Sequence, residues 1–251
     1  MVSTFYRVGL TVLLGIGIAT GWGCTQASQP PDQAATDEAQ PEAAPAESDA
    51  PEAASDPQAE WEAQQAQVAE VLETKSRDEL ISSSPTKGNA DATVVVYKFS
   101  DFQCPFCAIA AADMKGFVDG RDDVLYVYKH FPLNSIHPEA TPAAKAAWAA
   151  QQQDQFWLYH DGLFAYQDRL GEAYYVELAE QIGLDVEQFN RDRNSEAAAQ
   201  AVAEDLALAE ALELPGTPAF VMNDLLIPGG APLEFFNEAA DRLKAYDESQ
   251  P

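Results

Sequence analysis

The sequence predicts an α/β fold in which a parallel strand–helix–strand unit and a β-hairpin are separated by an all-helical insertion. Three observations carry this prediction. Residues 93–133 contain two β-branched, apolar runs on either side of a helical stretch. Residues 138–214 contain helical patterns and no strand pattern. Residues 215–230 contain two short apolar runs around an Asn-Asp dipeptide, which is the composition of a tight hairpin.

The elements can be placed in chain order. A first helix is expected at 60–82, where apolar side chains recur at helical intervals. Strands are expected at 93–100 and 123–133, with a helix at 108–120 between them. Two strands joined by a helix in this way form a right-handed parallel unit. With the hairpin and a last amphipathic helix, this order is that of a thioredoxin fold, enlarged by an insertion at about 138–214.

The first 24 residues have the pattern of a targeting segment. Arg7 precedes an apolar run at 8–19, and small residues then lead to Cys24. The run is short for a membrane span. We expect a signal peptide of the bacterial lipoprotein type, with Cys24 as the lipidated residue; an uncleaved anchor and cleavage elsewhere are the alternatives. In each case the rest of the chain lies outside the cytoplasm, where disulfides persist.

Residues 25–58 predict a disordered acidic tether, because they contain no basic residue, recurrent Pro and little apolar surface beyond Ala. Residues 59–251 then form the folded domain. Over the whole chain, 14 Lys and Arg oppose 41 Asp and Glu, for a formal net charge of −27. A charge of this sign repels nucleic acid and anionic membrane surfaces, so we expect no nucleic-acid partner.

Cys104 and Cys107 form a C-x-x-C pair, which can be a zinc half-site, a haem attachment point, a structural disulfide or a redox centre. A zinc site needs two further ligands, but Cys24 is remote and no two of the three histidines have zinc-ligand spacing. Haem attachment needs His directly after the second cysteine, and position 108 is Ala. A structural disulfide would close too small a loop to constrain much of the unfolded chain, although it stays an alternative.

The position of the pair favours redox chemistry. Pro105 suits the first residue of a helix, which makes Cys104 the N-cap. The free N–H groups of the first turn and the helix dipole then stabilise a Cys104 thiolate, so its pKa should lie below that of a free cysteine. Cys107, one turn further on, should be less exposed. Cys104 would exchange with the substrate and Cys107 would resolve the mixed disulfide.

Gly216-Thr217-Pro218 is the second element of the expected site. An X-Pro bond at the start of a strand, directly after Gly, is a place where a cis peptide can be held. A cis Pro218 would leave the backbone of Thr217 free to pair with a substrate chain beside Cys104. Most Thr-Pro bonds are trans and structural, so this prediction depends on the upstream cysteine pair.

Four motifs, in order, resemble those of the DsbA-like thiol-disulfide oxidoreductases of bacterial envelopes: FSDFQCPFC, KHFPL with HPEA, FWLYHDGLF and GTPAFVMN. The resemblance spans roughly residues 85–245 and implies a thioredoxin fold with a helical insertion. It implies a catalytic Cys104–Cys107 disulfide without any cofactor, a cis Pro218 and a peptide-binding groove around them. It also implies cysteine-containing secreted proteins as substrates, and a membrane redox partner, quinone-linked or similar, that recycles the disulfide.

Two positions depart from the family pattern. Phe106 stands where the best-known members carry His, whose charge can stabilise the thiolate; we therefore expect a less stable thiolate and a less oxidising disulfide here. Lys98 stands where a buried carboxylate is common. Its ammonium could favour the thiolate, or its amine could reach water from the end of the strand. Asp101 is a candidate replacement acid, although on strand periodicity it faces away from Lys98.

The other conspicuous side chains have simpler expected roles. His130 and His137 flank the end of the second strand and could lie near the cysteines, but roles in a turn and a helix cap are favoured. The aromatic side chains of the insertion are expected to form its core: Trp148, Phe156, Trp157, Tyr159 and Phe164.

The leading functional hypothesis is a membrane-tethered, extracytoplasmic dithiol oxidase that donates the Cys104–Cys107 disulfide to secreted proteins. One alternative is a reductase or isomerase kept reduced by a membrane partner. Another is a non-catalytic peptide-binding or chaperone module that keeps the disulfide as a structural bond. No dimerisation domain is evident, so we expect a monomer.

Overall fold

The computed structural model describes residues 56–249. The predicted leader, its lipidation residue Cys24 and nearly all of the predicted tether lie outside the described residues. The folded part begins with helix α1 (Pro57–Glu73), two residues before the predicted start of the domain at 59. Among residues 56–249, no helix has the length and apolar character needed to cross a membrane.

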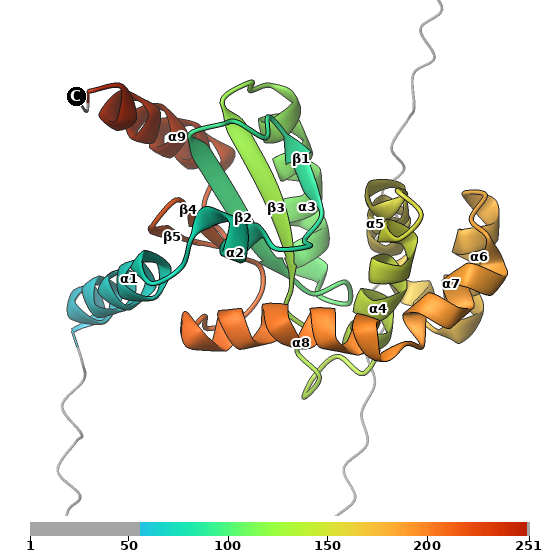
Figure 1. Ribbon diagram of the computed structural model, residues 1–251. Helices are drawn as coiled ribbons and strands as arrows, with labels where there is room; N and C mark the ends of the chain where they lie inside the picture. The colour runs from blue at the N-terminus through green and yellow to red at the C-terminus, as the bar shows by residue number, and fades with distance from the viewer. Residues whose placement is uncertain (1–55, 250–251) are drawn as a thin grey trace, which may run out of the picture. The chain divides into compact units, whose positions relative to one another are not determined.

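The described residues form one mixed sheet of five strands in the order β1-β3-β2-β4-β5 (Figure 1). Strands β2 and β3 run parallel, and every other neighbouring pair is antiparallel. The strands are β1 (Thr86–Gly88), β2 (Val94–Ser100), β3 (Val124–His130), β4 (Ala219–Met222) and β5 (Leu225–Pro228). The predicted parallel unit and the predicted hairpin therefore meet in one sheet.

The two central strands form where the sequence predicted them, because all seven residues of each are buried. β3 is shorter than predicted and ends at His130, since the chain turns away at Phe131-Pro132 and a proline has no N–H for the ladder. Strand β1 was missed. It has only three residues, in a stretch where the sequence predicts no element, and it is held by antiparallel pairing with β3.

The predicted first helix at 60–82 is wrong as one continuous element. Helix α1 ends at Glu73, and a separate short helix, α2 (Arg77–Ile81), follows. Ser76 accounts for the restart, because it forms a capping box with Glu79: the Ser76 side chain accepts from the Glu79 N–H, and the Glu79 carboxylate accepts from the Ser76 N–H. The polar residues between α1 and α2 are compatible with one continuous helix, but they also contain the N-cap of a second helix.

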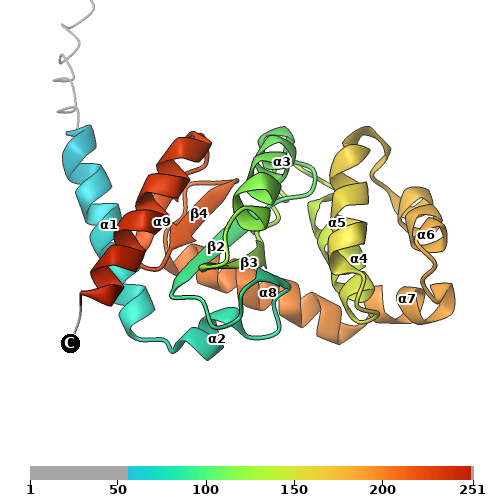
Figure 2. The ribbon, with the colours of Figure 1, turned by 90° about the horizontal axis from the view of Figure 1, so that it is seen from above.

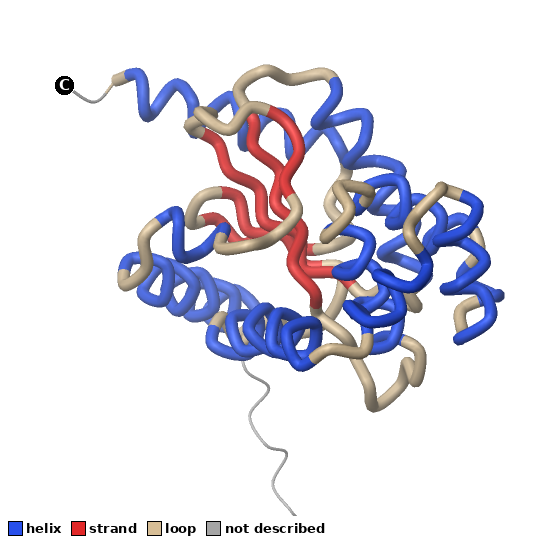
Figure 3. The backbone as a smooth tube through the Cα atoms, turned by 45° about the vertical axis from the view of Figure 1, so that its right-hand side comes forward, coloured by secondary structure: helices blue, strands red, loops and turns tan. Residues whose placement is uncertain are grey.

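Helices cover both faces of the sheet (Figure 3). On one face, helices α3 (Pro105–Asp119) and α9 (Leu233–Glu248) pack on apolar side chains of the central strands, including Val94 and Val96. On the other face, α1 and the long helix α8 (Glu196–Ala211) pack on the alternate positions, including Val95 and Tyr97. The side chains of β2 therefore alternate between two apolar layers.

The helical insertion between β3 and β4 is confirmed, and it forms its own apolar cluster beside the sheet (Figure 2). Its elements are α4 (Ala140–Gln151), α5 (Phe156–Ala165), the 3₁₀ turn η1 (Gln167–Arg169), α6 (Glu172–Gln181), α7 (Val186–Arg193) and α8. Phe102 and Tyr128 belong to the same cluster, so the insertion is packed against the end of the sheet that carries the cysteines.

Candidate active site

The two cysteines lie where β2 leads into α3. Pro105 is the first residue of α3 and Cys104 is its N-cap, so the helix begins three residues earlier than the predicted 108–120 segment. The Cys104 carbonyl accepts from the N–H groups of Cys107 and Ala108, at 3.1 and 3.4 Å. The N–H groups of Phe106 and Cys107 in the first turn also act on the Cys104 sulfur, as the position of Pro105 predicts.

The two thiols differ in environment and in acidity. Both are free, Cys104 is 4% exposed and Cys107 is completely buried. The pKa of Cys104 is lowered to about 5, first by a hydrogen bond from the Cys107 thiol and further by the backbone N–H groups of Phe106 and Cys107. Burial raises the pKa of Cys107, and the same hydrogen bond adds to this shift. The pair therefore carries one thiolate, on the sulfur nearer the surface.

A carbonyl lies directly beside the thiolate. The Thr217–Pro218 peptide bond is cis, which confirms the expected geometry. The Cys104 sulfur lies 3.4 Å from the Thr217 carbonyl oxygen, to which the Cys104 thiol donates when protonated. Gly229 packs so closely on this segment that a Cβ there would overlap the Pro218 carbonyl oxygen. Residues 113 positions apart in the chain are thus brought together at one edge of the site.

Lys98 lies beneath the cysteines and not at the water surface. Its side chain is completely buried, so the expectation of an amine that reaches water is wrong. Its Nζ donates to the Cys107 carbonyl oxygen at 3.2 Å and lies 5.1 Å from the centre of the Phe164 ring. Burial lowers the pKa of Lys98 to about 8, although the neighbouring Cys107 and Cys104 act in the opposite direction.

The Asp101 carboxylate is committed to the loops around the site and does not replace the missing acid. It accepts from the N–H groups of Gln103 and Leu133, at 2.7 and 2.9 Å, and pairs with His137 Nδ1 at 2.8 Å. Its backbone N–H lies 3.5 Å from the Cys107 sulfur. His137 therefore has the turn role that the sequence favoured, and Asp101 touches the cysteines through its backbone alone.

An apolar groove of about 230 Å³ opens beside the cysteines, between α3 and the segment that leads from β5 to α9. Phe106 lies on its rim and is 67% exposed, and Ile109 on the next turn of α3 is also exposed. Exposed large apolar side chains around a groove are typical of a surface that binds another chain. The groove is lined by Phe106, Ile109, Met114, Phe220, Leu233 and Phe236, among others.

Residues 95–241 match the family described as the DSBA-like thioredoxin domain, which is more than half of the chain. The chain belongs to this family of thiol-disulfide oxidoreductases. The sequence motifs, the five-stranded sheet and the helical insertion all agree with that assignment.

Solved structures agree with the family assignment. A thioredoxin-like oxidoreductase from Silicibacter pomeroyi is 34% identical, with a TM-score of 0.63, over 68% of this chain and 99% of that chain. A periplasmic thioredoxin-like protein from Salmonella enterica has the same fold, with 22% identity and a TM-score of 0.59, over 70% of this chain and 97% of that chain.

A curated relative of a different kind also matches. The Na(+)/H(+) antiporter NhaA 3 of Salinispora tropica is 36% identical over 137 residues, which cover 55% of this chain and 21% of the antiporter. A second antiporter, NhaA 1 of Salinispora arenicola, is matched over 26% of its length. The chain thus spans about a quarter of the curated relatives that it matches.

One residue that holds this DSBA-like site together has no recognisable signal in the sequence. Gln167 lies in η1, and its amide donates to the carbonyl oxygens of Phe102 and Cys104, at 2.7 and 2.9 Å. The 3₁₀ turn of the insertion thus fixes the backbone of Cys104. A polar residue far along the chain, outside any motif, could not be recognised as part of the site from its spacing.

Two histidines, His130 and His160, are buried near the site. His130 is buried at the end of β3 and contacts the rings of Phe102 and Tyr128 in tilted and edge-on arrangements, so its predicted turn role is wrong. His160 of α5 is also buried and pairs through Nδ1 with Asp161 Oδ1 at 2.8 Å. Burial lowers the pKa of both imidazoles to about 4, which keeps them neutral at physiological pH. No cluster of metal-ligand side chains occurs within residues 56–249.

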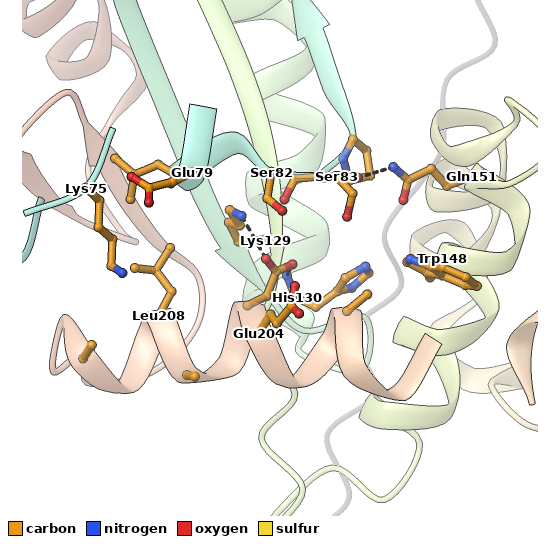
Figure 4. A pocket seen from close by; sticks show the side chains of 17 residues that line it. Lys75, Glu79, Ser82, Ser83, Lys129, His130, Trp148, Gln151, Glu204 and Leu208 are labelled. Atoms are coloured by element: carbon orange, nitrogen blue, oxygen red, sulfur yellow. Dashed lines mark hydrogen bonds and ion pairs between the residues drawn. The ribbon is translucent and has the colours of Figure 1, made fainter. Parts of the chain in front are cut away.

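A second cavity, of about 350 Å³, contains neither cysteine (Figure 4). Lys129 and His130 line it from β3, and Trp148 and Gln151 line it from α4. Trp148 therefore borders a cavity and is not part of the insertion core, unlike Phe156 and Tyr159 of the prediction. Within the wall of this cavity, Lys129 Nζ pairs with Asp205 Oδ1 of α8 at 2.9 Å.

Proposed function

We propose that the protein is an extracytoplasmic dithiol oxidase that donates the Cys104–Cys107 disulfide to secreted proteins. One observation carries the direction of electron flow: the pKa of the surface-side thiol, Cys104, is lowered to about 5, chiefly by the hydrogen bond from Cys107. A disulfide whose reduced form is stabilised in this way is a strong oxidant. The same property would be a disadvantage in a reductase, because its dithiol would give up electrons less readily.

The exchange takes two steps. A substrate thiolate attacks the Cys104 sulfur and breaks the disulfide, which leaves a mixed disulfide and a Cys107 thiolate that takes up a proton. A second substrate thiolate then attacks the substrate sulfur of the mixed disulfide, and Cys104 departs as a thiolate. Two electrons pass from the substrate dithiol to the enzyme. The low pKa of Cys104 speeds the second step, because a more acidic thiol is a better leaving group.

The surroundings of Cys104 support an extended polypeptide as the substrate. The Thr217 carbonyl lies beside the sulfur and can accept a hydrogen bond from a substrate N–H. The apolar groove with Phe106 on its rim can take side chains on one side of the cysteine. Backbone pairing supplies affinity without selecting a sequence, so the site suits many partly folded chains.

The compartment and the recycling partner follow from the same chemistry. The predicted leader supports a location outside the cytoplasm, and a protein of the same fold is described as periplasmic. After each turnover the enzyme is a dithiol, so an electron acceptor must restore its disulfide. We assign that step to a redox partner in the membrane to which the N-terminus is tethered.

The equilibrium reduction potential tests the direction. In the Cys24→Ser variant, only the Cys104–Cys107 pair can react, and its redox state in glutathione buffers gives the potential. We expect a value in the oxidising range, about −120 to −180 mV. A value near about −270 mV would reverse the proposal and indicate a reductase or isomerase.

The Cys104→Ser variant tests whether the groove is catalytic at all. We expect it to lose oxidation of a reduced model substrate such as reduced ribonuclease, while Cys107 stays buried and unreactive. Activity equal to that of the unmodified protein would overturn the enzymatic proposal and leave a peptide-binding module with a structural disulfide. Circular dichroism of the variant controls for folding.

A further inference from the structure

We infer that Lys98 is the proton partner of the cysteine pair: its amine takes up one proton when the Cys104–Cys107 disulfide is reduced and releases it when the disulfide forms. The inference rests on the proposed function, because it requires the two cysteines to cycle between dithiol and disulfide. Lys98 acts through the cysteines and does not touch the substrate. Its role is to balance the charge of the cysteine pair in each redox state.

The geometry of Lys98 is unusual for a lysine. Its side chain is completely buried, and among residues 56–249 its amine has no carboxylate within ion-pair distance. Its hydrogen-bond acceptor is the carbonyl of Cys107, at 3.2 Å, and the ring of Phe164 lies 5.1 Å away. A carbonyl dipole and a ring face stabilise an ammonium less than a carboxylate does. The counter-charge must therefore come from elsewhere.

The cysteines of α3 can supply that counter-charge. Cys107 and Cys104 are the two groups that most strongly favour the protonated form of Lys98, and Asp161 of α5 is the next. In the reduced protein, Cys104 is a thiolate at neutral pH because its pKa is lowered to about 5. In the disulfide the same sulfur is neutral, so the buried ammonium loses this counter-charge on oxidation.

The other groups around Lys98 keep a constant charge between about pH 6 and pH 9. From α5, His160 stays neutral because burial lowers its pKa to about 4, and Asp161 stays anionic because its hydrogen bond to His160 lowers its pKa. From β3, burial raises the pKa of Tyr128 well above its usual range, so it stays neutral. From β4, the register partner is Phe220, which does not titrate.

Only Lys98 and the cysteines can therefore change charge together in this range. Burial already lowers the pKa of Lys98 to about 8 with the dithiol present, and removal of the thiolate lowers it further. At a pH between the pKa of Lys98 in the oxidised protein and its pKa in the reduced protein, Lys98 is an amine when the protein is oxidised and an ammonium when it is reduced.

The step balances in atoms and charge. A substrate dithiol brings two protons and two electrons, and the enzyme disulfide and neutral Lys98 amine receive them. The products are the substrate disulfide, a Cys104 thiolate, a Cys107 thiol and a Lys98 ammonium. One proton is on Cys107 and the other on Lys98, and the net charge of the site is zero before and after the reaction.

The pH dependence of the reduction potential tests the inference. Each proton taken up with the two electrons changes the equilibrium constant tenfold per pH unit, which is about 30 mV. A dithiol that forms one thiolate and one thiol takes up one proton. With Lys98 the pair takes up two, so we expect a hundredfold change per pH unit, about 59 mV, just below pH 8. Above about pH 8 the slope should fall to about 30 mV.

Lys98→Met supplies the variant, with Cys24→Ser in every protein. We expect its slope to be about 30 mV per pH unit from pH 6 to pH 9, without the break. The matched control is Lys129→Met with Asp205→Asn, which removes the other buried lysine of the sheet and its charge partner together. It should keep the steep segment and the break.

The outcomes separate this inference from the proposed function. A single slope of about 30 mV in the protein with Lys98 intact would overturn the inference, and this measurement does not depend on the folding of any variant. A steep segment that persists in Lys98→Met would overturn it as well, because another group would then carry the proton. Failure of Cys104 and Cys107 to form a disulfide at any potential would overturn the proposed function instead.

Discussion

Lys98 and Lys129 are two buried lysines on neighbouring strands, and they differ in how their charge is balanced. Lys98 pairs in register with Tyr128, so Lys129 is one position further along β3 and faces the opposite side of the sheet. Lys129 has a carboxylate partner, Asp205 of α8, at 2.9 Å. Lys98 has the carbonyl of Cys107 and, in the reduced protein, the cysteine thiolate.

Because of this difference, the charge of Lys129 has a structural role, whereas the charge of Lys98 is linked to the redox chemistry of the cysteines. Lys129 and Asp205 neutralise each other's charge, and the second Asp205 oxygen also accepts from the His130 N–H at 2.9 Å. Because nothing in a reaction cycle alters these charges, we call this ion pair closed. The charge around Lys98 changes whenever the disulfide is made or broken. A buried ion pair is costly to break, whereas a buried lone charge is costly to keep. Substitutions at the two sites should therefore act in opposite directions.

The largest effect is expected at the closed pair. Asp205→Leu leaves the Lys129 ammonium buried without a partner, and we expect the free energy of unfolding to fall by about 3–5 kcal/mol. Urea denaturation at pH 7 measures it. Lys129→Met with Asp205→Asn removes both charges and keeps an acceptor for the His130 N–H, so most of the loss should be recovered. If Asp205→Leu lowers the free energy of unfolding by less than about 1 kcal/mol, the buried Lys129 charge does not depend on Asp205 for its compensation.

The next effect concerns the cysteine site. Cys107→Ala removes the hydrogen bond that contributes most to the low pKa of Cys104, so that pKa should rise from about 5 by about one to two units. The ultraviolet absorbance of the thiolate, followed against pH in the Cys24→Ser background, measures it. The double variant at Lys129 and Asp205 is the control and should leave the pKa unchanged. An unchanged pKa in Cys107→Ala would assign the stabilisation to the helix N-terminus alone.

A gain in the free energy of unfolding is expected when Lys98 is replaced. The pKa of Lys98 is lowered from 10.5 to about 8, which corresponds to roughly 3 kcal/mol of destabilisation. Lys98→Met removes this cost but also loses the contacts with Cys107 and Phe164, so we expect the reduced protein to gain about 1–2 kcal/mol at pH 7. A variant less stable than the unmodified protein at pH 7 would contradict the assignment of Lys98 as an uncompensated buried charge.

The same experiment has a defined pH dependence. A lowered lysine pKa means that the unfolded chain binds more protons than the folded protein between about pH 8 and pH 10.5. The stability of the unmodified protein should therefore rise across this range relative to the variant. The advantage of Lys98→Met is complete below about pH 8 and disappears near pH 10.5.

The smallest effect is expected at the rim of the cysteine site. Phe106→His places an imidazole beside Cys104, and below about pH 6.5 its charge should stabilise the thiolate. Because position 106 is 67% exposed, water screens the interaction, and we expect the pKa of Cys104 to fall by less than about one unit. The same absorbance titration measures it. A rise in the pKa would show that the Phe106 ring protects the thiolate.

Local patterns were sufficient for much of this molecule. β2 and β3 are continuous buried runs, so their composition predicts them wherever they pack. Pro105 defines the start of α3 and makes Cys104 its N-cap, because its missing N–H is tolerated in the first turn. The hairpin around Asn223-Asp224 likewise follows from turn chemistry over a few residues.

Local patterns failed where a short element depends on a distant partner. Strand β1 has three residues and exists because β3 offers it a free edge. The break between α1 and α2 depends on a capping box at Ser76, inside a polar stretch that is also compatible with one helix. Gln167 belongs to the site because η1 of the insertion reaches the backbone of Cys104, 63 residues earlier.

The sequence by itself determined the fold class, the cysteine pair, its place at a helix start and the proline opposite it, because each of these depends on residues that are close together in the sequence. The tertiary structure decided the state of the charges. Lys98 is a strand residue whose amine could reach water until α5 of the insertion covers it, and Lys129 is paired because Asp205, 76 residues further on, faces it from α8. Burial and ion pairing depend on contacts between distant segments, so no local pattern records them.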